Sequence, residues 1–151
     1  MAILFPMDKM YETYVAKHIR NIFTEVKWQG SLQDQGYYLF DTPHRFALRP
    51  DIVVTTENGH KIIFDTKWKK LNNNSSGNYG ISQADMYQMY AYAKKYRTPD
   101  VWLIFPKTYD TCDCANISYQ SEDNVNVRIF FVDVANIEES VQSLQEEILK
   151  G

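Results

Sequence analysis

The sequence has few cysteines and no long apolar run. Its two cysteines, Cys112 and Cys114, are too few for a disulfide framework or a four-thiolate metal site. No stretch approaches the ~20 apolar residues of a membrane span, and the N-terminal MAILFPMDK lacks the basic and long apolar regions of a signal peptide. We therefore expect a cytoplasmic protein with reduced thiols and no part in a membrane.

The sequence also has no excess of positive charge. A formal net charge of -3 argues against a protein that holds nucleic acid by bulk charge, although a local basic patch or a bound cation could serve instead. At 151 residues, 44% of them hydrophobic, the chain is long enough for one domain with a real core. We expect a single domain over residues 1–151, and its early start in a helix pattern suggests the C-terminal part of a longer protein as an alternative.

Apolar spacing along the chain predicts alternating helices and strands. Helices are expected over residues 6–27, 82–96 and 136–150, and strands over 36–41, 46–56, 61–68, 101–106 and 125–134. Ser82 followed by Asp85 predicts a capping box, and the Asn-, Ser- and Gly-rich segment 71–80 indicates a mobile loop. We expect the first three strands to form a meander. The fold class is then α/β, with a mixed β-sheet flanked by helices.

One predicted hairpin carries the chemistry. In LRPDIVVTTENGHKIIFDTKWKK, two apolar runs are joined through the turn ENG, and each run has an aspartate at the end away from the turn. These are Asp51 and Asp65, and Lys67 follows two residues later. Charged residues at the ends of strands that are otherwise apolar call for an explanation.

The turn decides whether the two aspartates can meet, and two registers are compatible with the sequence. With a two-residue turn, Asp51 falls opposite Thr66 and on the other face from Asp65. With a three-residue loop, in which Gly59 is left-handed, Asp51 pairs with Asp65. Lys67 then lies on the same face, because strand side chains alternate.

In the second register, the two carboxylates repel each other unless something lies between them. A divalent cation would offset the repulsion, and oxygen ligands suit Mg²⁺, with Mn²⁺ as an alternative. Lys67 beside the cation could orient an attacking water or stabilise charge in the transition state. The simpler reading is that Asp51 and Asp65 face solvent and that Lys67 is a surface ion-pair partner.

The hairpin residues resemble the PD-(D/E)XK nuclease signature, with Pro50-Asp51 before the turn and Asp65-Thr66-Lys67 after it. The segments ILFPMDKMYETYVAKHI, RPDIVV, FDTKWK, ISQADMYQMYAYAKKY and WLIFP, together spanning residues 3–106, are similar to parts of McrC. McrC is the nuclease subunit of 5-methylcytosine-dependent restriction systems. The resemblance implies a restriction-endonuclease-like core that binds Mg²⁺, acts on DNA, and has an McrB-like AAA+ GTPase as its partner.

Two helices offer further candidate residues. Glu12 falls within the apolar arc of the first helix, and the resemblance implies a helical acidic residue that supports the metal; a glutamate with only its stem buried is the alternative. The second helix has two Gln-x-x-x-Tyr spacings on opposite sides, of which only one can face the metal. Gln88 and Tyr92 match the motif of RecB-like nucleases better than Gln83 and Tyr87.

The expected function is therefore a metal-dependent endonuclease with Asp51, Asp65, Lys67, Glu12, Gln88 and Tyr92 in its site. Asp51, Asp65 and Glu12 are the expected metal ligands. A stand-alone RecB-like or repair nuclease is the alternative within enzymes. A DNA-binding or assembly module that keeps the nuclease fold without cutting is the alternative outside them.

Overall fold

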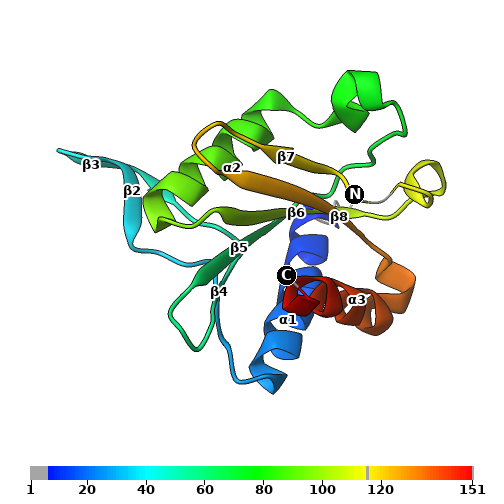
Figure 1. The fold of residues 1–151 in the computed structure, drawn as a ribbon, viewed down its shortest axis with the longest axis horizontal. Coiled ribbons are helices and arrows are strands. Elements are labelled where there is room, and N and C mark those ends of the chain that lie inside the picture. The colour runs from blue at the N-terminus through cyan, green and yellow to red at the C-terminus, as the bar shows by residue number, and fades with distance from the viewer. Residues whose placement is uncertain (1–6, 115, 151) are drawn as a thin grey trace, which may run out of the picture.

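The computed structural model describes residues 7–114 and 116–150, and it has a mixed β-sheet between layers of helices (Figure 1). The helices are α1 (Met7–Glu25), α2 (Gln83–Tyr96) and α3 (Ile137–Lys150). The sheet has six strands in the order β1 (Gln29–Leu32), β4 (Ile52–Thr55), β5 (Lys61–Thr66), β6 (Asp100–Pro106), β8 (Asn126–Val132) and β7 (Ser118–Gln120). Strands β5, β6 and β8 are parallel, and the other pairs are antiparallel. The predicted mixed α/β architecture is confirmed.

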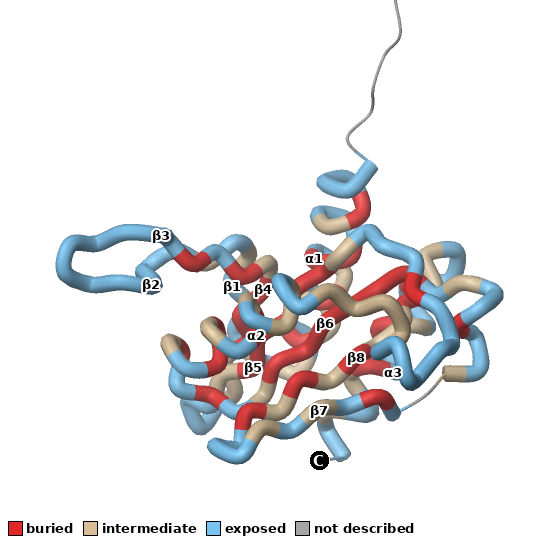
Figure 2. Tube along the Cα trace, turned by 90° about the horizontal axis from the view of Figure 1, so that it is seen from above, coloured by how far each residue is buried: buried red, intermediate tan, exposed pale blue. Residues whose placement is uncertain are grey.

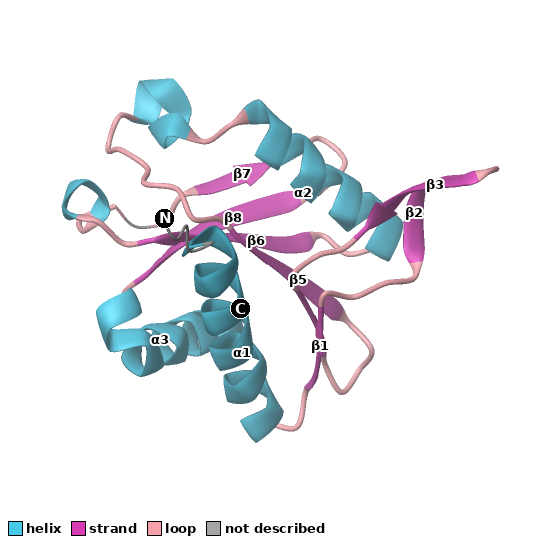
Figure 3. Ribbon diagram, turned by 180° about the vertical axis from the view of Figure 1, so that it is seen from behind, coloured by secondary structure: helices cyan, strands magenta, loops and turns pink. Residues whose placement is uncertain are grey.

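Each face of the sheet is covered by its own helices. α1 and α3 lie on one face and α2 lies on the other (Figures 1 and 3). Along β5, Phe64 belongs to the hydrophobic cluster under α1 and α3, whereas Ile63 belongs to the cluster under α2. This alternation assigns Asp65, two residues after Ile63, to the α2 face and Thr66 to the α1 face.

The predicted meander of three strands is wrong. β2 (Tyr37–Asp41) and β3 (His44–Leu48) pair only with each other in a separate two-stranded sheet, which projects from the body of the molecule (Figures 1 and 2). The strand expected over 46–56 is interrupted after Leu48, because Pro50 has no N–H to contribute to a ladder. β1 takes the place beside β4 instead.

The hairpin of β2 and β3 leaves large apolar side chains uncovered. Phe46 is 71% exposed, and Phe40, Leu39 and Tyr38 are exposed as well. The hairpin contacts the C-terminal end of α2. There the Tyr37 and Tyr96 rings pack edge to face, with their centroids 4.5 Å apart. It is an arm on the domain rather than part of the central sheet.

The helix boundaries follow the expected signals. The Ser82 side chain accepts a hydrogen bond from the Asp85 N–H, and α2 ends with Arg97 in the left-handed conformation just before Pro99. The predicted start of the first helix at Pro6 lies outside the described residues. Within the segment expected to be a loop, short 3-10 turns over Ser75–Gly80 are interrupted by non-helical backbone at Gly77, Asn78 and Tyr79. Among the described helices, none has the length and apolar character needed to cross a bilayer.

Candidate functional site

A three-residue loop joins β4 and β5. The Thr56 N–H donates to the His60 carbonyl over 2.8 Å, and the Gly59 N–H donates to the Thr56 carbonyl over 3.0 Å. Gly59 has a φ of 81°, in the left-handed region that favours glycine. Ile52 lies opposite Phe64 in the resulting register. The three-residue register is confirmed.

This register brings Asp51 and Asp65 together at the open end of the hairpin, one position beyond the Ile52 pair. The Asp51 N–H donates to Oδ1 of Asp65 over 3.2 Å. In return, Oδ2 of Asp51 accepts hydrogen bonds from the backbone N–H and the side-chain hydroxyl of Thr66, both 2.8 Å long. The two strand ends are therefore tied together by the aspartate side chains as well as by the ladder.

Lys67 joins the aspartates to helix α2. Its Nζ lies 2.9 Å from Oδ2 of Asp65 and donates to Oε1 of Gln88 over 2.7 Å. Gln88 in turn donates to the Tyr92 hydroxyl over 2.9 Å. Asp65, Lys67, Gln88 and Tyr92 thus form one chain of contacts from β5 to α2. We call Asp51, Asp65 and Lys67 the aspartate site.

The alternative Gln-x-x-x-Tyr pair points away from the aspartate site. Tyr87 is 69% exposed, and its hydroxyl lies 3.5 Å from Oε1 of Gln83 at the surface. Side chains four apart share one side of a helix, so the two pairs on α2 face opposite directions as expected. Only the pair of Gln88 and Tyr92 reaches Lys67.

Burial and like charge perturb the ionisation of the acidic groups. Burial raises the pKa of Asp65 and the Asp51 carboxylate raises it further, against the opposing effect of Lys67, to about 7. Burial raises the pKa of Glu12 above its usual range, and the Asp51 carboxylate adds to this effect. Negative charge is therefore crowded at this end of the hairpin.

The cationic group of the aspartate site behaves differently. Burial lowers the pKa of Lys67, but Asp65, Asp85 and Asp51 together raise it by more, so that the net shift is upward. Lys67 is thus held as an ammonium group. Burial, followed by the charges of Asp65 and Asp51, raises the pKa of the Tyr92 hydroxyl, which keeps it protonated as a hydrogen-bond donor or acceptor.

Glu12 approaches the aspartate site from α1. It lines a cavity of about 290 Å³ together with Asp51, Ala16, Leu32 and other residues of α1 and the strand ends. Asp51 therefore faces two ways, toward Thr66 through Oδ2 and toward the cavity that holds Glu12. Glu12 is half-buried, consistent with a carboxylate turned partly inward.

Oxygen donors at the aspartate site suit a hard divalent cation. Asp51 and Asp65 bring two carboxylates together, and a cation would relieve the repulsion that raises the pKa of Asp65. Within residues 7–114 and 116–150, no three His, Cys, Asp or Glu side chains gather as a ready-made metal-binding group. Ligation of a cation by Asp51, Asp65 and Glu12 therefore stays a prediction.

Two neighbours of the aspartate site were not expected to take part. The Asp85 Oδ1 lies 3.7 Å from Nζ of Lys67, although the sequence suggests only a capping role for this residue. Its spacing of three from Gln88 places both on one side of α2, which is the signal that could have revealed it. Thr66 occupies the unspecified position of the Asp-x-Lys pattern, so the motif gives no indication of its bonds to Asp51.

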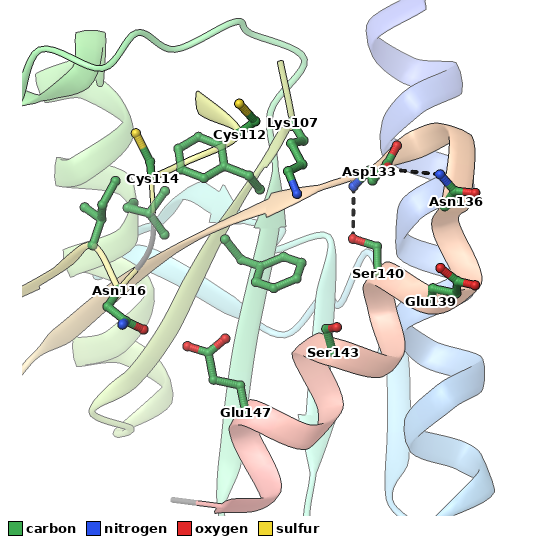
Figure 4. A pocket seen from close by; sticks show the side chains of 14 residues that line it. Lys107, Cys112, Cys114, Asn116, Asp133, Asn136, Glu139, Ser140, Ser143 and Glu147 are labelled. Atoms are coloured by element: carbon green, nitrogen blue, oxygen red, sulfur yellow. Dashed lines mark hydrogen bonds between the residues drawn. The ribbon is translucent and has the colours of Figure 1, made fainter. Parts of the chain in front are cut away.

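A larger cavity, of about 430 Å³, lies between β8 and α3 (Figure 4). Cys112, Cys114, Glu139 and Glu147 are among its lining residues. None of the residues predicted for the site lines it. We therefore do not assign it to the chemistry of the aspartate site.

Comparison with known proteins adds a family and a related fold. The sequence model of the family described as "McrBC 5-methylcytosine restriction system component" matches residues 1–106. No curated protein matches the chain. A similar solved chain comes from a structure described as a half-complex from a tetradecameric assembly of Thermococcus gammatolerans McrB AAA+ hexamers with bound McrC. Its TM-score is 0.73 over 94% of this chain, at 14% identity, which shows a shared fold; this chain spans 33% of the solved one.

Proposed function

Because the chain belongs to the McrBC 5-methylcytosine restriction system component family, we propose that it is the nuclease module of a modification-dependent restriction system. It would hydrolyse DNA phosphodiester bonds with Mg²⁺, using a PD-(D/E)XK core. The observation that carries this proposal is the hairpin register, which joins Asp51, Asp65 and Lys67 in one hydrogen-bonded group. A solvent-facing pair of strand ends does not account for this group, because Asp65 is only 3% exposed.

Asp51 and Asp65 are the residues that would hold the cation. When bound, Mg²⁺ lowers the pKa of a coordinated water and polarises a phosphoryl oxygen. The aspartates supply two carboxylates on adjacent strands, and the hydrogen bonds to Asp51 and Asp65 restrict the rotation of both side chains. Glu12, on the wall of the adjoining cavity, would add a third carboxylate near the cation.

Lys67 is placed to stabilise charge that develops on the phosphate. As an ammonium group it donates hydrogen bonds and cannot accept a proton, so its role is electrostatic rather than that of a general base. Gln88 fixes the ammonium from the helix side, and Tyr92 fixes the amide of Gln88. The pair on α2 would therefore act by positioning Lys67.

We also propose that the whole protein works with an McrB-like AAA+ GTPase in the cytoplasm. The support is the family membership and the likeness to a chain of an assembly that contains McrB and McrC. A net charge of -3 gives this module little attraction for DNA by itself, which fits delivery of the DNA by a partner. Because this chain spans a third of the similar chain, contacts with the partner can lie in other parts of the protein.

Metal titration tests the core of this proposal. Mn²⁺ or Mg²⁺ should bind the wild-type chain, as followed by calorimetry, and binding should be lost in Asp65→Ala. Asp123→Ala, which removes an exposed aspartate from the turn between β7 and β8, serves as the matched control and should bind like wild type. Equal binding by wild type and Asp65→Ala would show that Asp65 is not part of a metal site and would overturn the proposal.

Cleavage assays then separate the three functional classes. If the chain cuts methylated DNA only when an McrB-like GTPase is present, the result supports its function as the nuclease subunit of a restriction system. Cutting without any partner would indicate a stand-alone RecB-like or repair nuclease. DNA binding without cutting, with metal and partner present, would indicate an assembly module that keeps the fold.

A further inference from the structure

Thr66 is the residue between the aspartate and the lysine of the Asp-x-Lys pattern. It is only 1% exposed, so water does not reach its side chain. Strand alternation places it on the α1 face of the sheet, whereas Asp65 lies on the α2 face. Its hydroxyl nevertheless bonds to a group of the aspartate site, the carboxylate of Asp51.

Both hydrogen bonds from Thr66 go to the same oxygen. The backbone N–H and the hydroxyl each donate to Oδ2 of Asp51 over 2.8 Å. An ionised carboxylate oxygen has two lone-pair positions, and these two donors use both. Among the hydrogen bonds of the described residues, none uses the other oxygen, Oδ1. The two oxygens of Asp51 are therefore not equivalent.

We propose that Thr66 is a positioning residue that fixes the Asp51 carboxylate, so that Oδ1 alone is presented to the cation. This inference rests on the proposed function, since it takes the aspartate site to be a metal site. The backbone N–H of Thr66 holds the oxygen in any variant. The hydroxyl supplies the second bond, so that two donors rather than one fix the orientation of the carboxylate plane.

The hydroxyl also keeps Oδ2 of Asp51 bonded to Thr66. Without the hydroxyl, one hydrogen bond in place of two would hold the Asp51 carboxylate, and its orientation relative to Asp65 would be less restricted. Groups that orient metal ligands in this way affect metal affinity or activity by about 10–100-fold when they are removed. Thr66 is expected to act in this range.

Two substitutions separate the hydroxyl from the volume of the side chain. Thr66→Val keeps the shape of a buried, β-branched side chain and replaces the hydroxyl with a methyl group. Thr66→Ser keeps the hydroxyl and removes a methyl group. Thr55→Val is the matched control, because Thr55 lies at the turn end of β4, away from the end of the hairpin that carries Asp51.

The experiment is a Mn²⁺ titration of the 151-residue chain and the variants by calorimetry, after circular dichroism has established that each one is folded. We expect Thr66→Val to weaken Mn²⁺ binding by about 10–100-fold, and Thr66→Ser and Thr55→Val to bind within a few-fold of wild type. In a cleavage assay, Thr66→Val should lower kcat and leave the KM for DNA unchanged.

The outcomes distinguish this inference from the proposed function. If Asp65→Ala loses Mn²⁺ while Thr66→Val binds it like wild type, the metal site stands and the role of Thr66 is refuted. If Thr66→Ser is as weak as Thr66→Val, the side chain acts by packing and the inference fails. If Asp65→Ala binds Mn²⁺ like wild type, the proposed function fails and takes this inference with it.

Discussion

The backbone N–H of Asp51 donates a hydrogen bond to the side chain of Asp65, across the end of the β4–β5 hairpin. The donor that stabilises the Asp65 carboxylate thus belongs to the backbone of Asp51, the residue that carries the second carboxylate. The geometry holds two like charges in a fixed relation, although their mutual repulsion favours separation. Repulsion of this kind, retained in a folded protein, predicts measurable effects of pH and of substitution.

Asp65 should make the protein less stable as the pH rises. Its pKa of about 7 in the folded state lies above the value of about 3.9 for an unfolded aspartate, so the folded state binds more protons between these values. This contribution to stability is fully present below pH 4 and is lost as the pH rises through 7. We expect the free energy of unfolding in chelator to fall by on the order of 2 kcal/mol between pH 5 and pH 8. Asp65→Asn should flatten this dependence in urea denaturation; an unchanged slope would contradict the prediction.

Removal of the ammonium group should expose the cost of the buried aspartate. Lys67→Met leaves Asp65 without its 2.9 Å partner, and we expect a loss of about 1–3 kcal/mol at pH 8. The loss should shrink at pH 5, where Asp65 takes up a proton. Urea denaturation of Lys67→Met, Asp65→Asn and the double variant gives the coupling free energy between the two positions. A coupling near zero would mean that the pair contributes nothing to stability.

The two Gln-x-x-x-Tyr pairs provide a matched comparison on one helix. Gln88→Leu removes the acceptor of the Lys67 ammonium group, and we expect cleavage to fall by about 10–100-fold. Gln83→Leu changes the same residue type at the exposed pair and should leave the cleavage rate within two- to three-fold of wild type, a margin on the order of 0.5 kcal/mol. Equal effects at the two positions would show that Gln88 has no special place in the site.

The turn that sets the register can be tested through Gly59. Its φ of 81° lies in the left-handed region, where a side chain with a Cβ costs about 1–2 kcal/mol. Gly59→Ala should lower the free energy of unfolding by about 1 kcal/mol, whereas Gly59→Asn should lower it by less, because asparagine tolerates this conformation. No atom lies near the added Cβ, so a larger loss would point to a steric clash that the structure lacks.

Deletion of one loop residue should have a different effect from a change at Gly59. Without Glu57, Asn58 and Gly59 can form a two-residue turn that keeps Thr56 opposite His60, so Asp51 stays opposite Asp65. We expect the deletion variant, once circular dichroism shows that it is folded, to bind Mn²⁺ like wild type. Glu57→Ala keeps the loop length and should bind Mn²⁺ like wild type as well. Loss of Mn²⁺ binding in a folded deletion variant would show that the register alone does not build the site.

The central hairpin and the helices could be predicted because their signals are local. Apolar runs define β4 and β5, and glycine at the third loop position favours the register that is observed. Ser82 marks the start of α2 through its own side chain. In each of these cases the residues that carry the signal also make the contact.

The missed elements depend on partners far along the chain. β1, with the sequence QGSL, has little apolar character, and it is a strand because its backbone pairs with the edge of β4. β2 and β3 have strong strand sequences, yet Pro50 separates them from the sheet, so propensity alone could not tell an arm from a central strand. Asp85 was explained by its local cap, which hid its approach to Lys67.

The position of the sheet between two hydrophobic clusters has a thermodynamic consequence. Glu12 comes from the helix layer on one face and Gln88 from the layer on the other, while the aspartates stand at the end of the strands between them. A ligand that requires all of these groups binds only when both layers are packed at once. Its binding energy therefore couples the two clusters: with the ligand bound, unfolding of one cluster while the other stays folded becomes less favourable. The protein should melt in a narrower, more cooperative transition with the ligand than without it.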